Sequence, residues 1–184
     1  MTMDYNKLRY LCKFLKREVP EALISGDPKV TGIIEEANGR IHLMDFQYQE
    51  AEKSLRESFL LYQNTGNPKA KDMIKLYTIA NILSNNEFGP FDLPQVRIYQ
   101  SEPDIELYKN LRLAFEQKDH KEFLQILNNK LHLEQDNFTK SLVPELKRVI
   151  LQEFVLKIIP IYSVLSFSYL EKELSLSRAQ VKQI

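Results

Sequence analysis

Residues 28–62 read PKVTGIIEEANGRIHLMDFQYQEAEKSLRESFLLY, and this stretch decides the fold. Its apolar residues recur every three or four positions in two runs, which is the period of a buried helix face. The first run predicts a helix that has Asp27 as its N-cap and Pro28 in its first turn. After a tight turn at residues 45–47, the second run predicts a partner helix. The apolar residues of that partner are Ala51, Leu55, Phe59 and Tyr62.

Gly39 lies in the middle of the first of these helices, where glycine costs about 1 kcal/mol relative to alanine. Ala51 follows on the antiparallel partner, so two small residues allow the helices to approach closely. The same spacing is typical of the tetratricopeptide (TPR) type of helix hairpin, a repeat of about 34 residues. Glu35 stands where that repeat has an aromatic residue. A degenerate helical repeat and an ordinary helix pair with a tolerated glycine both remain open at this point.

Helical periodicity continues along most of the chain, which has only five glycines. Further helices are expected at residues 4–19, 69–83, 104–117, from 120 onward, and 142–159. Asp119 and Glu122 are expected to form a capping box at the helix that begins near His120. Residues 85–103 contain several prolines but are too apolar for a free linker. We expect them to form an ordered connection that packs across helix ends.

The last residues, 161–184, change character. Residues 162–167 are apolar and partly β-branched, which favours a short strand. Capping boxes at Ser168 and Ser177 predict two short helices with a turn at residues 175–176. A strand that leads into a helix-turn-helix is how a winged-helix module begins, and the chain stops at Ile184 before any wing strand. We therefore expect an all-α chain with a truncated winged-helix end.

The composition excludes several classes of protein. Lys and Arg number 25, as do Asp and Glu, so the formal net charge is zero. This disfavours a protein that mainly grips nucleic acid. The single cysteine, Cys12, fits a reducing compartment. No apolar run approaches the roughly 20 residues that span a bilayer, and the N-terminus lacks a signal-peptide pattern. We expect a protein of the cytoplasm and nucleus without membrane contact.

The residues with catalytic or metal-binding chemistry are isolated from one another. His42, His120 and His132 have no His, Cys or paired carboxylate at ligand spacing, which favours packing or surface roles. Cys12 lies on the apolar face of the expected first helix, which favours a buried structural thiol. Phosphate-binding, dinucleotide-binding, serine-hydrolase and zinc-protease motifs are absent from the sequence. We predict no catalytic residue, no cofactor site and no metal site.

Two groups of residues are candidates for a partner interface. Four basic residues of the first helix lie opposite its apolar face, and they form either a solvated face or a dock for an acidic partner or a polyphosphate. The helix-turn-helix has a net charge of only one positive, which disfavours direct nucleic-acid binding. The candidate residues are Arg9, Lys13, Lys16 and Arg17 on the first helix, and Phe167, Tyr169, Arg178 and Lys182 at the C-terminal end.

The sequence also resembles a known family over most of its length. The helix LYTIANIL at residues 76–83, followed by NNEFGPFD at 85–92, is similar to a helix with an alanine-asparagine pair and a proline-phenylalanine-aspartate turn in the subunit 2 family of the COP9 signalosome. Further similar segments keep the same order and spacing over residues 27–184, which makes the resemblance specific. These segments are Gly39–Leu43, Glu102–Ile105, Asn110–Leu111, Phe123–Leu127, Asp136–Phe138 and Lys172–Leu174.

The resemblance implies helical repeats that lead into a PCI domain, which is a helical bundle followed by a winged helix. It implies TPR-like repeats at residues 1–84, a PCI bundle at 85–160 and a partial winged helix at 161–184. Such subunits are scaffolds whose winged helices align edge to edge, while another subunit holds the metalloprotease that removes Nedd8 from cullins. The expected partners are other PCI-domain subunits and cullin-RING ligases. The chain itself is expected not to be an enzyme.

Other placements within the wider PCI family remain open. The proteasome lid paralogue shares the architecture but resembles residues 88–92 less well. A PCI protein of an mRNA-export complex would bind nucleic acid, which the neutral charge disfavours. Family members are far longer, with more N-terminal repeats, a wing and a C-terminal bundle helix. We therefore expect either a fragment of a longer protein or a reduced homologue.

Overall fold

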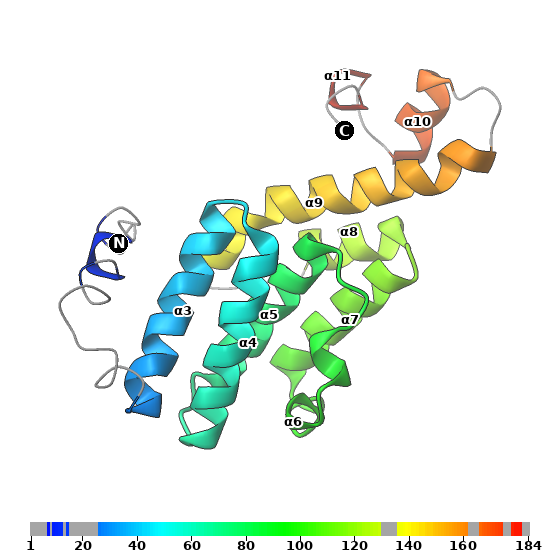
Figure 1. Ribbon diagram of the computed structural model, residues 1–184. Helices are drawn as coiled ribbons and strands as arrows, with labels where there is room; N and C mark the ends of the chain where they lie inside the picture. Colours follow the sequence, from blue (N-terminus) through cyan, green and yellow to red (C-terminus); the bar gives the residue numbers. More distant parts are fainter. Residues whose placement is uncertain are drawn as a thin grey trace. The chain divides into compact units, whose positions relative to one another are not determined.

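The computed structural model in Figure 1 describes residues 7, 9–12, 14, 26–129, 136–161, 166–174 and 178–181. These residues form helices joined by turns, and no β-strand occurs among them. The prediction of an all-α fold is therefore confirmed. The chain divides into two compact units, Met1–Lys109 and Asn110–Ile184, and each is described by itself. The domain limits expected after residues 84 and 160 stay predictions.

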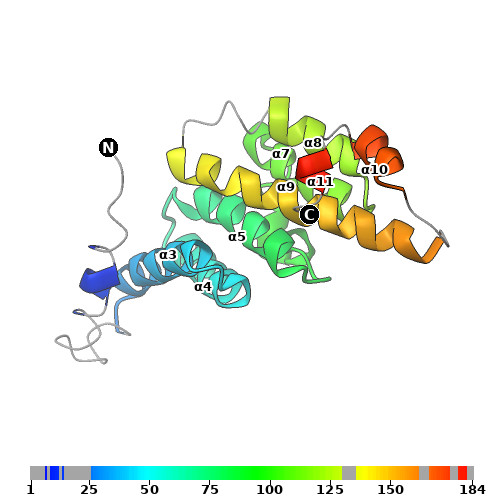
Figure 2. The same cartoon turned by 90° about the horizontal axis from the view of Figure 1, so that it is seen from above.

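The first unit is built on three consecutive helices: α3 (Pro28–Met44), α4 (Tyr48–Asn64) and α5 (Ala70–Ser84). α3 begins as predicted, because the Asp27 side chain accepts a hydrogen bond from the Lys29 N–H at 2.8 Å. α3 packs along α4, and α4 packs along α5 (Figures 1 and 2). The fully buried side chains of this unit include Leu55, Phe59, Met73 and Ile79.

Small residues bring α3 and α4 close together, as the sequence predicted. A Cβ atom at Gly39 would lie 2.5 Å from Cγ of Leu55, and one at Gly32 would lie 2.8 Å from a ring carbon of Tyr62. Both distances are well below an ordinary carbon–carbon contact. The two glycines thus leave space on the face of α3, and the side chains of Leu55 and Tyr62 pack into it. Ala51 is also fully buried, but Leu55 is the side chain that lies against Gly39.

A half-buried carboxylate, that of Glu36 on α3, links α3 to α4 and to the residue that precedes α5. The Tyr62 hydroxyl donates to Glu36 at 2.8 Å, while Arg40 and Lys69 pair with Glu36 at 3.1 and 3.2 Å. Burial opposes the ionisation of Glu36, but the Tyr62 hydrogen bond and the two positive charges outweigh it and lower the pKa of Glu36 below its ordinary value. The charged form of Glu36 therefore stabilises the packing of α3 and α4 at the start of α5.

The connection after α5 is ordered, as predicted. It contains a 3₁₀ turn, η1 (Pro90–Asp92), and a short helix, α6 (Pro94–Arg97). The next helix, α7 (Pro103–Glu116), carries the boundary between the two units. Val96 is fully buried, whereas Phe88 is 76% exposed. Some apolar residues of this segment, such as Val96, therefore pack into the core, while others, such as Phe88, face solvent.

The described residues of the second unit form the end of α7, four more helices and a 3₁₀ turn. They are α8 (His120–Asn129), α9 (Asn137–Ile158), η3 (Ile159–Ile161), α10 (Phe167–Leu174) and α11 (Arg178–Val181). α9 begins earlier than predicted, because Asp136 caps it by accepting from the N–H groups of Phe138 and Thr139 at 3.1 and 3.4 Å. Pro144 therefore lies inside the helix, where it has no N–H to donate.

The capping box predicted at α8 forms only by half. The Asp119 side chain accepts from the N–H groups of Lys121 and Glu122, both at 3.1 Å. Its own N–H donates to the Ala114 carbonyl at 2.9 Å, and this bond closes the end of α7. The Asp119 N–H is therefore already used where a capping box would need Glu122 to accept from it.

The predictions for the two ends of the chain are partly wrong and partly outside the described residues. Phe167, predicted as the end of a strand, instead opens α10. The cap of α10 is Ser166 and not Ser168, because the Tyr169 N–H donates to the Ser166 hydroxyl at 3.2 Å. Residues 162–165, 175–177 and 182–184 lie outside the described residues. Of the first predicted helix, residues 7, 9–12 and 14 are helical.

Candidate protein-interaction surfaces

The predicted residues at the C-terminal end gather on α10 and α11. Phe167 and Tyr169 are 43% and 37% exposed. The guanidinium of Arg178 lies 5.5 Å from the centroid of the Phe167 ring, within cation–π range. Lys182 lies outside the described residues. Exposed aromatic rings beside an arginine are residue types enriched in protein interfaces.

A charged contact holds α10 to α8 within the second unit. The Lys121 ammonium lies 2.8 Å from the Glu173 carboxylate. Beside it, the buried His120 ring has its centroid 3.9 Å from that of Phe154 on α9. Burial, together with the positive charge of Lys121, lowers the pKa of His120 below its ordinary value. The segment that presents Phe167 and Tyr169 is therefore tied to the body of its own unit.

The predicted basic face of the first helix is described only at Arg9. Its guanidinium pairs with the carboxylate of Asp45, the C-cap of α3. Lys13, Lys16 and Arg17 lie outside the described residues. Cys12 is buried, as predicted for a structural thiol. Arg9 therefore has a partner within its own unit.

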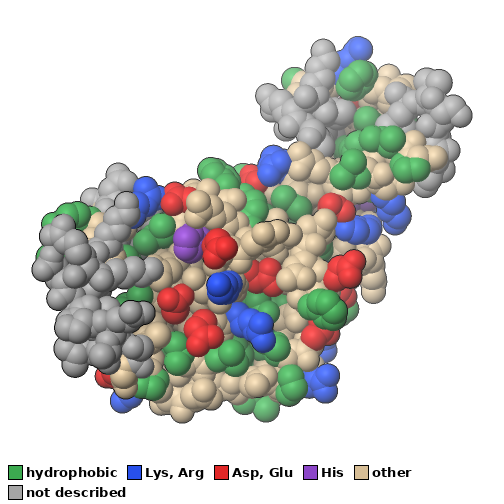
Figure 3. All heavy atoms as spheres, in the orientation of Figure 1, with side chains coloured by type: hydrophobic (Ala, Val, Ile, Leu, Met, Phe, Trp, Pro, Cys, Tyr) green, Lys and Arg blue, Asp and Glu red, His purple; other side chains and the backbone are tan. Residues whose placement is uncertain are grey.

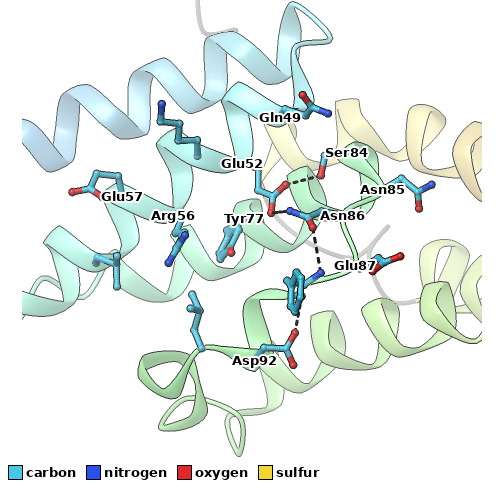
Figure 4. A pocket seen from close by; sticks show the side chains of 15 residues that line it. Gln49, Glu52, Arg56, Glu57, Tyr77, Ser84, Asn85, Asn86, Glu87 and Asp92 are labelled. Atoms are coloured by element: carbon cyan, nitrogen blue, oxygen red, sulfur yellow. Dashed lines mark hydrogen bonds between the residues drawn. The ribbon is translucent and has the colours of Figure 1, made fainter.

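A groove that the sequence did not predict lies in the first unit, between α4, the end of α5 and the following connection (Figure 4). Glu52 of α4 is its buried carboxylate. The Glu52 oxygens accept hydrogen bonds from Asn81 at 2.9 Å, Ser84 at 2.6 Å and Asn86 at 3.1 Å. Three uncharged donors thus hold the carboxylate, and through it they fix α4 to α5 and to the connection.

Asn81 also determines the path of the connection. Its amide donates to the Phe88 carbonyl at 2.8 Å, while Asn85 ends α5 in the left-handed conformation with φ 53°. Further on, the Asp92 carboxylate accepts from the Gly89 N–H at 2.8 Å. The alanine-asparagine pair and the proline-phenylalanine-aspartate turn, which carry the family resemblance, are therefore the residues that shape this wall of the groove.

The position of Glu52 in the sequence indicates that its side chain is buried. It lies three residues before Leu55 and seven before Phe59, on the apolar stripe of α4. A charged residue on such a stripe needs buried partners. Those partners lie 29 to 34 residues further along the chain, so no local pattern connects them with Glu52.

The described residues contain neither a metal-binding cluster nor a membrane-spanning helix. They hold no group of three or more His, Cys, Asp or Glu side chains placed to bind a metal ion. Within the same ranges, no helix is both long and apolar enough to cross a membrane. On the face seen in Figure 3, Lys and Arg side chains are interspersed with Asp and Glu. Exposed aromatic and arginine side chains, such as Phe167 and Arg178, are of the types enriched at protein–protein interfaces.

Residues 117–184 match the family model described as PCI domain, and the described part of this segment is helical. This match places the similarity to a PCI domain in the C-terminal part of the chain. The prediction made from the sequence motifs is therefore confirmed.

The chain is similar to COP9 signalosome complex subunit 2 of several organisms. The chain is 28% identical to that subunit of Dictyostelium discoideum, 26% to that of Drosophila melanogaster and 29% to that of Schizosaccharomyces pombe. Each similarity covers 85% of this chain but only 35% or 36% of the relative. The chain thus spans about a third of the length of these curated relatives.

Proposed function

We propose that the chain is a non-catalytic scaffold subunit of the COP9 signalosome, the complex that removes Nedd8 from cullins. The observation that carries the proposal is the similarity to COP9 signalosome complex subunit 2 over 85% of the chain. The PCI domain match at residues 117–184 supports it from the C-terminal side. In this proposal the chain works through protein–protein contacts, and the metalloprotease that cuts Nedd8 belongs to another subunit.

The expected partners are other PCI-domain subunits and cullin-RING ligases. The surface of α10 and α11 supports the first of these, because Phe167, Tyr169 and Arg178 are exposed side chains of the types found at interface centres. The zero net charge supports protein partners over nucleic acid. The single cysteine suits a reducing compartment, which supports the cytoplasm and nucleus as the location.

Affinity purification of the tagged full chain from cell extract, followed by mass spectrometry, tests this proposal. Recovery of cullins with PCI-domain subunits and a metalloprotease subunit is the expected result. Recovery of proteasome ATPases would assign the chain to the lid instead. Steeply salt-dependent, submicromolar RNA binding in a filter assay would favour an mRNA-export PCI protein.

Two matched variants locate the contact. Phe167→Ser is expected to reduce recovery of the other PCI-domain subunits, because it removes an exposed ring from the proposed interface. Phe46→Ser serves as the control, since Phe46 is also exposed but belongs to the first unit. Equal recovery with both variants would contradict the assignment of this surface.

A further inference from the structure

The groove between α4 and the connection after α5 is large enough for a segment of another protein. Its volume is about 1180 Å³, which exceeds the roughly 300–1,000 Å³ of most small-molecule pockets. All of the residues that line it belong to the first unit. The charges of the lining and an exposed aromatic ring within it limit which segment fits.

Carboxylates outnumber cations along the groove. Its lining contains four carboxylates and two cations, and both cations, Lys53 and Arg56, belong to α4. The carboxylate of Glu57 accompanies them on the same helix. The connection contributes the carboxylates of Glu87 and Asp92 and adds no cation to the lining. Figure 4 shows these two residues on the connection, with Arg56 and Glu57 on α4. The side of the groove formed by the connection is therefore acidic.

The fourth carboxylate, that of Glu52, adds to this negative charge. Glu52 is buried, and its three hydrogen-bond donors are all uncharged, so none of them neutralises it. Tyr77, which also lines the groove, responds to these charges. Burial raises the pKa of Tyr77, and the charges of Glu52 and Asp92 raise it further against the opposing charge of Arg56, to about 12. At Tyr77 the negative charges thus outweigh the positive one.

Phe88 presents an aromatic ring beside the acidic residues of the connection. The ring is 76% exposed, but the backbone that carries it is fixed on both sides. The Phe88 N–H donates to the Asn86 side chain at 3.3 Å, and the Phe88 carbonyl accepts from Asn81 at 2.8 Å. Among the described residues, no Lys or Arg lies over this ring. The face of an aromatic ring attracts a cation, and the neighbouring Glu87 and Asp92 strengthen that attraction.

An arginine side chain matches both features of the groove. Its guanidinium stacks on aromatic faces and pairs with carboxylates through two parallel hydrogen bonds. Its methylene groups pack on apolar surface, which Leu60 and Leu93 supply here. An acidic side chain would instead meet like charges on the connection.

We propose that this groove binds an extended segment of a partner protein that carries an arginine side chain. The guanidinium stacks on the Phe88 ring and pairs with the Asp92 carboxylate, one oxygen of which already accepts from the Gly89 N–H. Apolar residues beside the arginine pack on Leu60 and Leu93, and the other carboxylates of the groove add negative charge. This site is separate from the surface of α10 and α11 and does not depend on which complex contains the chain.

The test uses the full chain and a fluorescein-labelled probe peptide, glycine-leucine-arginine-leucine-serine-glycine with blocked ends, in a fluorescence anisotropy titration. Two further probes replace the arginine. The first carries citrulline, which keeps the shape of arginine without its charge, and the second carries aspartate. The arginine probe is expected to bind, and the citrulline probe is expected to bind about fivefold or more weakly, because the positive charge is lost.

Three variants of the chain locate the contact. Phe88→Leu removes the ring and keeps an apolar side chain, while Asp92→Asn removes the charge and keeps an oxygen that can accept from the Gly89 N–H. Glu106→Gln is the control, since Glu106 is an exposed carboxylate of α7 that lies outside the groove. Circular dichroism of each variant confirms that the chain is folded.

Phe88→Leu and Asp92→Asn are each expected to weaken binding of the arginine probe about threefold, whereas Glu106→Gln leaves it unchanged. Equal binding of the arginine and citrulline probes would overturn the proposal, as would tighter binding of the aspartate probe or no binding of any probe. An effect of Glu106→Gln as large as that of Asp92→Asn would also overturn it, because the attraction would then not be specific to the groove.

Discussion

Gly39→Ala provides a direct test of the packing between α3 and α4. In an ordinary helix this change is stabilising by about 1 kcal/mol, because alanine has the higher helix propensity. Here the new Cβ atom would lie 2.5 Å from Cγ and 2.7 Å from Cδ2 of Leu55. An ordinary carbon–carbon contact lies at about 3.5 Å or more, so the overlap amounts to about 1 Å.

Leu55 has little room to move away, because it is fully buried. Overpacking a well-packed core costs about 1–3 kcal/mol, and an overlap this large at an enclosed side chain belongs to the upper end of that range. Subtracting the gain in helix propensity of about 1 kcal/mol leaves a net loss of about 2 kcal/mol. The substitution is therefore expected to have the opposite sign from the one that helix propensity alone predicts.

Urea unfolding of the full chain, followed by circular dichroism, measures this loss. Ser54→Ala is the control, because it raises helix propensity on α4 without creating a clash and should change stability by less than about 0.5 kcal/mol. In the double variant Gly39→Ala with Leu55→Ala, the clash is absent, so the two losses should fall short of additivity by about 1 kcal/mol or more. A Gly39→Ala protein as stable as the parent, or a strictly additive double variant, would refute the reasoning.

Three further changes test other contacts by the same urea unfolding assay. Asn81→Ala removes one hydrogen-bond donor from the Glu52 carboxylate and from the Phe88 carbonyl, and it should lower the free energy of unfolding by about 2–3 kcal/mol. A decrease of less than about 0.5 kcal/mol would contradict the role given to this network. Asp136→Ala removes the N-cap of α9 and should lower the free energy of unfolding by about 1 kcal/mol. An unchanged urea midpoint would show that the cap does not contribute to stability. Because the folded-state pKa of His120 is lowered, stability should be full above about pH 6.5 and should fall as the pH drops from there towards the folded-state pKa. His120→Gln should flatten this slope, and a parent protein equally stable at about pH 7 and pH 5 would count against it.

Signals close together in the sequence predicted the structure well. Asp27 followed by Pro28 gave the start of α3, and the apolar period of residues 51–62 gave the buried face of α4. Both depend on contacts within a few residues. At α9 two local signals compete: Pro144 is unfavourable inside a helix, but the cap at Asp136 starts the helix before it.

The features that the sequence did not reveal depend on distant residues. The periodicity places Glu52 on a buried stripe, but only the fold brings Asn81, Ser84 and Asn86 to its oxygens. Likewise, no pattern near Lys121 indicates that Glu173 lies beside it. The fold class was therefore accessible from periodicity, whereas the groove was not.

Because of Pro144, the first turns of α9 are expected to unwind more easily than the segment that follows. Because the proline lacks an N–H, the ladder of backbone hydrogen bonds along this helix is interrupted at that residue, and the carbonyl of Lys140 loses its usual donor. Opening the turns between the cap and the proline therefore breaks one backbone hydrogen bond fewer than opening an equal length of the segment that follows. Amide protons at residues 141–143 are accordingly expected to exchange with solvent sooner than those around Ile150.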